Sequence, residues 1–370
     1  MPKALHIVAF DVPFPPSYGG VIDVFYKIKA LNDLGVQIHL HCFKYGREES
    51  NDLNEICKSV TYYERTKRSS LLFSKTPFIV GSRRSEKLIA NLCKDDVPIL
   101  FEGLHCCAFL NSDKLSKRIK IVRSHNIEHH YYQGLAAAEK KFLKRMYFLR
   151  EVGKLERFEQ QLSLASSILA ISPLDTGLLS SKYNNVYHVS AFHPYTTVEA
   201  KTGLGKTALY HGNLEVGENN QAALFLVNEV FNDLEIPLII AGNNPSFELR
   251  KAVSSKNNIT LKSNISTSEI EKLISEAQVN VLPTFQATGI KLKLLAALFL
   301  GRHCLVNPPM VASTGLESLC IIGETAAAMK SSLKKIVEED FSNDSIQKRK
   351  LILLDRFSNR KNAEKILDLI

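Results

Sequence analysis

The feature of the sequence that most constrains the fold is a repeated alternation of short apolar runs with helical segments. A strand pattern at 4–10 is followed by a helical pattern at 19–34 and a second strand pattern at 37–43. Further short apolar runs lie at 60–63, 99–102, 119–123 and 168–171. The charged amphipathic stretch at 136–165 is predicted to be helical, as one helix or as two. Such alternation predicts an α/β fold with a doubly wound parallel sheet.

The alternation begins again in the second half of the chain. Strand patterns lie at 209–211, 238–241, 259–261, 279–282 and 304–306, and helical patterns between them at 219–231, 245–254, 266–277 and 290–300. Ser266 followed by Glu269 is a capping-box signature for the third of these helices. The stretch 190–205 contains Pro194 and two glycines without periodicity and is predicted to be a linker. We therefore expect two doubly wound, Rossmann-like domains at 1–195 and 196–356.

The length and composition agree with two globular domains. A chain of 370 residues is too long for one ordinary core, and its 45% hydrophobic and 23% charged residues are typical of globular proteins. The seven cysteines show no C-x-x-C pair and no metal-ligand spacing, so we interpret them as reduced thiols of a cytosolic protein. A signal-peptide pattern and an apolar run long enough to span a membrane are both absent. A cytoplasmic location is therefore expected.

The positive charge is concentrated in the first half. Residues 1–195 hold 27 Lys and Arg against 19 Asp and Glu, whereas the remainder holds 20 against 19. The excess favours an anionic partner for the N-terminal half, such as a membrane surface, a lipid pyrophosphate or nucleic acid. Nucleic acid is the weakest of these, because the basic residues lack regular aromatic interleaving and no known motif is present.

Ligands of doubly wound sheets bind beyond the carboxyl ends of the strands, so we expect the site in a cleft between the domains. A dinucleotide-binding fingerprint and a phosphate-binding Walker loop are absent. The first strand leads instead into DVPFPPSYGG, from Asp11 to Gly20. Gly19 and Gly20 can bring free backbone N–H groups close to an anion at the start of a helix, although a tight turn alone would also use them.

Three further segments follow predicted strands. In RSHNIE, from Arg123 to Glu128, His125 can donate a hydrogen bond to a sugar or phosphate, or can be an ordinary loop histidine. YHGNLEVGENN ends at Asn220 and is a ligand-facing turn or a solvent loop. TFQATGIKLK, at 284–293, opens a helix with Gly289, Lys291 and Lys293, which suits a pyrophosphate but also fits a helix start with solvated lysines.

In this order, DVPFPPSYGG, RSHNIE, HGNLEVGENN and TGIKLKLLAALFLGRHCLV resemble the family-four group of GT-B glycosyltransferases over residues 4–325. The resemblance implies two Rossmann-like domains facing across a cleft, with the tail at 357–370 packing back on the first. It implies that His125 contacts the transferred sugar and that the reaction retains anomeric configuration without a metal or other cofactor. The expected donor-binding residues are Gly19, Gly20, Gly212, Asn213, Asn220, Gln286, Thr288, Gly289, Ile290, Lys291 and Lys293. The expected acceptor-side residues are Asp11, Arg123, Asn126 and Glu128.

The sequence departs from the family at its donor motif. Two glutamates usual in the family, for the sugar hydroxyls and the nucleotide ribose, align with Thr288 and Ala296. Asn213 and the pair at 219–220 stand where the family often has arginine and lysine. Lys291 and Lys293 are candidates to replace that charge. These departures keep open a non-catalytic GT-B subunit that binds a partner enzyme or a lipid.

The sequence favours transfer of a sugar from a nucleotide-sugar co-substrate to a carbohydrate or lipid-linked acceptor in surface polysaccharide or glycolipid assembly. A nucleotide-sugar epimerase remains an alternative, with Glu102 and Glu128 as its candidate carboxylates. Basic residues lie at 65–68, beside the apolar run 71–73, and recur along 140–157. They suit docking on the inner face of an anionic membrane, but they also fit a solvated helix face.

Overall fold

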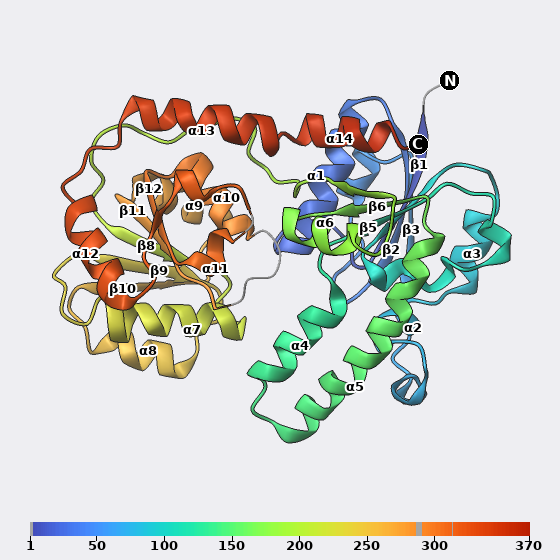
Figure 1. Cartoon of the computed structure of the whole chain (residues 1–370), viewed down its shortest axis with the longest axis horizontal. Helices are drawn as coiled ribbons and strands as arrows, with labels where there is room; N and C mark the ends of the chain where they lie inside the picture. The colour runs from blue at the N-terminus through green and yellow to red at the C-terminus, as the bar shows by residue number, and fades with distance from the viewer. Residues whose placement is uncertain (1–2, 286–290, 313) are drawn as a thin grey trace. The chain divides into compact units, whose positions relative to one another are not determined.

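The computed structural model describes residues 3–285, 291–312 and 314–370. The chain divides into two compact units, Met1–Pro194 with Phe357–Ile370, and Tyr195–Arg356 (Figure 1). This division lies one residue from the predicted boundary and falls inside the predicted linker at 190–205. In the described residues no helix is long and apolar enough to cross a membrane.

The first unit is built on a parallel sheet in the order β3-β2-β1-β4-β5-β6-β7. Its strands are β1 (Ala4–Ala9), β2 (Gln37–Lys44), β3 (Ser59–Glu64), β4 (Ile99–Glu102), β5 (Lys120–Ser124), β6 (Ser167–Ala170) and β7 (Val186–His188). The register pairs Ala4 with Gln37 and His6 with Ile99, so the strands on either side of β1 both run parallel to it. All the predicted strands of this half are present, and β7 is an additional edge strand.

Helices cover both faces of this sheet. They are α1 (Gly19–Asp33), α2 (Phe78–Gly81), α3 (Glu86–Leu92), α4 (Glu128–Ala138), α5 (Phe142–Glu159), α6 (Pro173–Ser180) and α14 (Asn359–Leu367). Short 3₁₀ turns lie at η1 (Asn51–Glu55), η2 (Ser69–Phe73), η3 (Leu104–Phe109), η4 (Asp113–Leu115) and η5 (Gln160–Leu164). The predicted helical stretch at 136–165 is broken at 139–141, and α4 and α5 lie side by side as a hairpin (Figure 1).

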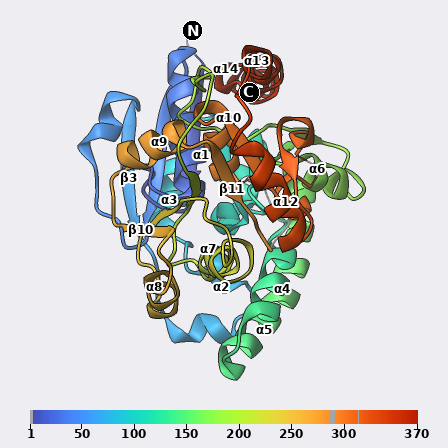
Figure 2. The same cartoon turned by 90° about the vertical axis from the view of Figure 1, so that its left-hand side faces the viewer.

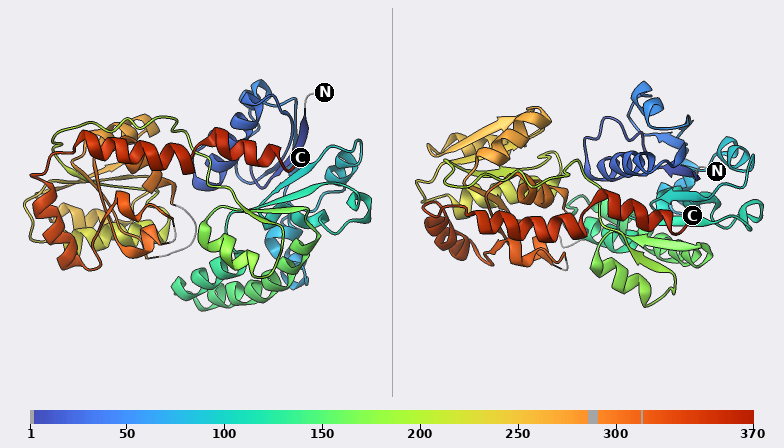
Figure 3. Two further views of the ribbon diagram at one scale, coloured as in Figure 1. Left: turned by 45° about the horizontal axis from the view of Figure 1, so that its top comes forward. Right: turned by 90° about the horizontal axis from the view of Figure 1, so that it is seen from above.

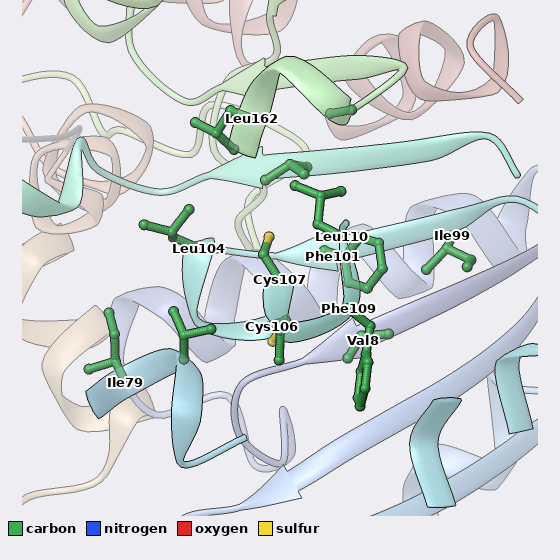
Figure 4. Packing of buried hydrophobic residues seen from close by; sticks show 14 of the residues in the cluster. Val8, Ile79, Ile99, Phe101, Leu104, Cys106, Cys107, Phe109, Leu110 and Leu162 are labelled. Atoms are coloured by element: carbon green, nitrogen blue, oxygen red, sulfur yellow. The ribbon is translucent and has the colours of Figure 1, made fainter. Parts of the chain in front are cut away.

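The alternation of side chains along the strands divides the core of the first unit into two clusters. On β1, Leu5 and Ile7 are buried against α1 and α14, whereas Val8 points to the opposite face. Figure 4 shows this second cluster, in which Val8 and Phe101 lie among residues of α2, η3 and η5. Cys106 and Cys107 are part of it and are free thiols.

The second unit has a parallel sheet in the order β10-β9-β8-β11-β12-β13. Its strands are β8 (Ala208–His211), β9 (Leu238–Gly242), β10 (Ile259–Ser263), β11 (Val279–Leu282), β12 (His303–Val306) and β13 (Ile321–Ile322). Its helices are α7 (Gly217–Phe225), α8 (Phe247–Ser254), α9 (Thr267–Glu276), α10 (Leu292–Leu300), α11 (Pro308–Val311), α12 (Ala326–Ile336) and α13 (Asn343–Arg356), with a 3₁₀ turn at η7 (Glu317–Leu319).

These helices also lie on both faces of their sheet, with α7 and α8 on one side and α9 and α10 on the other (Figure 2). A π-helical turn, η6 (Leu226–Val230), extends α7, so the helix predicted at 219–231 is present with an altered last turn. The predicted capping box is confirmed, because Ser266 and Glu269 bond each other's backbone N–H groups. Both units are therefore doubly wound α/β domains.

The C-terminal tail belongs to the first unit, where α14 lies against α1 (Figure 3). Ala363 and Ile366 are fully buried in the cluster on that face. Lys3 Nζ donates hydrogen bonds of 2.7 Å and 3.1 Å to the backbone carbonyls of Leu367 and Ile370. The tail is thus an integral layer of the first unit.

Candidate functional site

A network of buried charges lies at the carboxyl ends of β4 and β5 in the first unit. Lys27 Nζ, from α1, donates to Glu102 Oε1 at 2.7 Å and to Asp23 Oδ2 at 2.9 Å. Arg123 donates to Asp23 Oδ1 at 2.9 Å. His125 Nε2 lies 3.0 Å from Glu102 Oε2, and the exposed fraction of the His125 side chain is 12%. The network holds the imidazole of His125 in place while leaving part of it accessible.

The two cations keep the carboxylates of this network ionised. Burial alone would raise the pKa of Asp23, but Arg123 and Lys27 outweigh it and lower that pKa far below its ordinary value. Glu102 behaves in the same way: burial alone would raise its pKa, but Lys27 and His125 outweigh burial and lower it. Asp23, Glu102 and His125 have the spacing of metal ligands. However, Lys27 and Arg123 already neutralise the carboxylates, so the cluster fits a structural ion-pair network better than a cation site.

Arg123 was expected on the acceptor side, and the structure corrects this expectation. Its side chain is fully buried, and besides Asp23 it donates to the carbonyl oxygens of Val189 and Ser190. An arginine enclosed in this way is not accessible to an acceptor. Its role is to join β5 to the segment after β7.

Aromatic packing connects His125 to the start of α1. The ring of Phe10, at the end of β1, meets the His125 ring edge-on with centroids 5.5 Å apart. A Cβ on Gly20 would lie 2.7 Å from Phe10 Cζ, so a larger residue at this position would have to displace the Phe10 ring. Gly19 and Gly20 form the first turn of α1, where backbone N–H groups have no partner within the helix. The glycines and His125 thus share one edge of the first sheet.

The loop before these glycines is held by Asp11. Its carboxylate accepts from the Val12 backbone at 2.9 Å and from the Tyr18 hydroxyl at 2.8 Å. Arg47 Nε donates to the carbonyl of Val12 at 2.8 Å on the same loop. Burial raises the pKa of Asp11 above its ordinary value. Asp11, expected on the acceptor side, is almost fully buried and acts on the loop conformation instead.

Glu128 and Asn126 line a cavity of about 10 Å³ together with Ser124 and Leu104. A space of this size holds at most one water molecule and excludes a sugar. Burial, with Glu159 nearby, raises the pKa of Glu128 to about 8. The expectation that Glu128 faces the acceptor is therefore wrong, because its carboxyl group is enclosed in the first unit.

In the second unit a pair of lysines lies at the start of α10. Lys293 Nζ donates to Asn219 Oδ1 at 2.9 Å and lies 5.2 Å from the ring centroid of Tyr210. Lys291 Nζ lies 3.5 Å from Glu218 Oε1. Burial and repulsion from Lys291 lower the pKa of Lys293 to about 8, against the attraction of Glu218. The structure thus brings Lys291 and Lys293, the last two predicted residues of 284–293, next to the predicted segment at 210–220.

The remaining predicted donor residues of this unit have different surroundings. Asn213 accepts from the Glu215 backbone at 3.2 Å, and Asn220 accepts from the Ser246 backbone at 3.3 Å, so both amide groups stabilise loops. Gly212 follows β8 beside the side chain of Asn219. Ala296 is buried on α10 and offers no polar group. Gln286, Thr288, Gly289 and Ile290 lie outside the described residues.

Several residues of these clusters were missing from the sequence-based expectations. Asp23 and Lys27 stand four residues apart among the apolar positions of a helical segment, which is a signal for a buried pair. Tyr210 and Glu218 lie inside a segment that was singled out, but their contacts depend on β8 and α7 both lying close to the start of α10. No local pattern indicates such a contact.

Comparisons with known proteins give the fold. No model of a known protein family matches the chain. An uncharacterized 44.6 kDa protein in the cps region of Klebsiella pneumoniae is 27% identical over 331 residues, covering 84% of this chain and 83% of that protein. The structure of TarM superposes with a TM-score of 0.69 at 11% identity, covering 99% of this chain and 98% of that one.

HepE of Anabaena, solved in complex with UDP and glucose, superposes with a TM-score of 0.67 at 10% identity over 100% of this chain and 99% of that one. These structural neighbours are GT-B glycosyltransferases. Superposition over nearly the whole of each chain, with two doubly wound sheets, means that this protein has the GT-B fold.

Proposed function

We propose that the chain is a glycosyltransferase that moves a sugar from a nucleotide-sugar to a carbohydrate or lipid-linked acceptor. The GT-B fold supports this proposal, as do structural neighbours solved with UDP, among them a TarM variant of S. aureus with UDP and alpha-GlcNAc-glycerol. The relative in a cps region supports a role in polysaccharide assembly. The donor's nucleotide binds the second unit, and the acceptor binds the first.

The observation that carries the proposal is the Lys293 ammonium group at the carboxyl edge of the second sheet. Among the described residues its hydrogen-bond partners are neutral, namely the Asn219 amide and the Tyr210 hydroxyl. A partly buried cation without a bonded carboxylate is costly in the free protein. A diphosphate supplies the missing negative charge, with Lys291 as a second cation nearby.

The proposed reaction retains anomeric configuration and uses no metal and no other cofactor. Lys291 and Lys293 neutralise the leaving diphosphate, a task that a divalent cation performs elsewhere. In the first unit, the first turn of α1, at Gly19 and Gly20, offers backbone N–H donors to an anionic group. His125, oriented by Glu102, holds a hydroxyl of the transferred sugar. The carboxylates near it are paired with cations and do not act as a base, which disfavours the epimerase alternative.

The test is a thermal-shift screen with UDP-, GDP-, ADP- and CMP-sugars. A ligand at about 100 times its dissociation constant should stabilise the protein by roughly 2.7 kcal/mol. We expect one nucleotide class to stabilise the wild type and to lose this effect with Lys293→Met. Binding requires the charged lysine, so affinity should fall above pH 8, by up to about tenfold per pH unit, and Lys293→Arg should remove this dependence.

A second arm separates binding from transfer. His125→Ala should keep the thermal shift with the donor and lose most of the transfer activity, because the side chain contacts the sugar and not the nucleotide. Lys206→Met is the matched control for Lys293→Met, because Lys206 lies near the opposite end of β8. This control should keep the thermal shift. If no donor class shifts the melting temperature, the non-catalytic alternative is favoured. The observation that supports this alternative is the apolar Ala296 at a position where the family has a glutamate.

A further inference from the structure

Helix α5 has two opposite faces, and only one of them is covered by the first unit. Glu151, Lys154 and Leu155 are buried on the inner face. Phe142, Met146 and Leu149 follow one another at helical spacing on the other side. The exposed fraction is 73% for Phe142 and 82% for its neighbour Leu143. Large apolar side chains grouped in this way indicate a binding surface.

A second segment adds to this surface. Phe73, in η2, is 75% exposed, and the Arg150 guanidinium of α5 lies 5.5 Å from its ring centroid. Lys154 Nζ donates to the backbone carbonyl of Leu72 at 2.9 Å, which fixes η2 beside α5. We call the resulting surface the outer face of α5, formed by Phe73, Phe142, Leu143, Met146 and Leu149.

Positive charges surround the outer face. The exposed cations between 139 and 157 are Lys140, Lys141, Lys144, Arg145, Arg150 and Arg157. Two carboxylates share this stretch without being buried, Glu139 and Glu156, and Glu139 is paired with Lys144 at 2.7 Å. Glu151 and Lys154 form a buried ion pair, 2.7 Å apart, whose charges cancel and leave the net positive charge of this stretch unchanged. The surface therefore combines apolar side chains with an excess of cations.

We propose that the outer face of α5 docks on an anionic lipid bilayer, with Phe142 and Leu143 inserted among the headgroups. Apolar side chains flanked by lysine and arginine match an interface in which acyl chains lie beneath negative phosphates. A second copy of the chain fits less well, because pairing two such faces would bring cations together. The docking does not depend on the proposed transferase activity, since it involves none of the residues assigned to it.

The test is co-sedimentation of the full chain with vesicles of phosphatidylcholine alone, or of phosphatidylcholine with an equal part of phosphatidylglycerol. We expect binding to the anionic vesicles only, weakened by high salt. The double variant Phe142→Ser with Leu143→Ser should reduce the partition coefficient by at least about tenfold. Arg145→Glu with Arg150→Glu should reduce it by about tenfold or more.

Phe247→Ser is the matched control, because Phe247 is also 82% exposed but lies on α8 of the second unit. It should bind vesicles as the wild type does, and circular dichroism should show all variants folded. Equal binding by the wild type and the double serine variant would overturn the proposal, as would failure of the wild type to bind anionic vesicles. Sedimentation velocity without lipid tests the other occupant. If the wild type is an oligomer and the double serine variant is a monomer, the outer face of α5 binds a second copy of the chain and the proposal is overturned.

Discussion

Carboxyl groups buried in the same domain have opposite ionisation behaviour because their neighbours differ. Burial opposes ionisation of Asp23 and Glu102, but Arg123 and Lys27 lower the pKa of Asp23, and Lys27 and His125 lower that of Glu102. Glu128 is equally buried, but here burial and the neighbouring carboxylate of Glu159 outweigh the opposing charge of Arg83, so its pKa rises to about 8. The first pair therefore carries charge at neutral pH, whereas Glu128 is mostly protonated there.

Replacing Glu128 by glutamine tests this difference. The folded protein holds a proton on Glu128 up to about pH 8, whereas the unfolded chain releases it near pH 4.5, so stability falls as pH rises between these values. Glutamine mimics the neutral form. Glu128→Gln should match the wild type near pH 4.5 and exceed its free energy of unfolding at pH 9 by up to about 4–5 kcal/mol. Urea denaturation at the two pH values measures this.

The exposed Glu156→Gln on α5 is the control and should change stability by less than about 0.5 kcal/mol at either pH. A Glu128→Gln variant that is destabilised equally at both pH values would show that the carboxylate is ionised in the folded protein.

At the scale of elements, the end of β1, the start of α1 and the end of β5 meet through Phe10, Gly20 and His125. Gly20→Ala should displace the Phe10 ring, because the new Cβ would lie 2.7 Å from Phe10 Cζ. The ring packs on His125, so we expect reduced transfer activity with little loss of donor binding.

Gly177→Ala is the matched control for this substitution. Gly177 lies within α6, and a Cβ there would meet nothing within 4 Å. Alanine should be tolerated and should stabilise the helix by about 0.5–1 kcal/mol. Transfer kinetics and nucleotide titration of both variants distinguish the cases; full activity of Gly20→Ala would exclude a role for this packing.

The elements that were predicted from the sequence are those with a strong local pattern. The buried strands β4 and β11 have the predicted bounds because each is a short, mostly apolar run, and Pro283 directly after β11 ends that strand. The edge strands β7 and β13 were not predicted, since they are two or three residues long and partly exposed. The Asp23–Arg123 pair joins residues 100 positions apart and follows from sheet topology alone. The candidate site was thus predicted as segments, whereas its internal contacts and the burial of Glu128 were not.

At the scale of the whole molecule, the chain leaves the first unit after Pro194 and returns to it at Phe357. The return is fixed by side chain to backbone hydrogen bonds: Asn359 Nδ2 donates to the His193 carbonyl at 2.7 Å, and His193 Nε2 donates to that of Phe357 at 2.8 Å. The segment that leaves the first unit, at His193, is therefore hydrogen-bonded to the segment that returns to it, at Phe357 and Asn359.

The buried tail makes the stability of the first unit depend on residues beyond the second unit in sequence. Ile366 is fully buried beside α1, so Ile366→Ala should lower the free energy of unfolding of the first unit by about 2–4 kcal/mol. Leu351→Ala is the control, since Leu351 is 77% exposed on α13, and it should change stability by less than about 0.5 kcal/mol. Hydrogen exchange of Ile366→Ala should show lost protection in α1 and β2 with α9 and α10 unchanged, because the two units have separate cores. An equal loss of protection in both units would mean instead that they unfold as one cooperative structure.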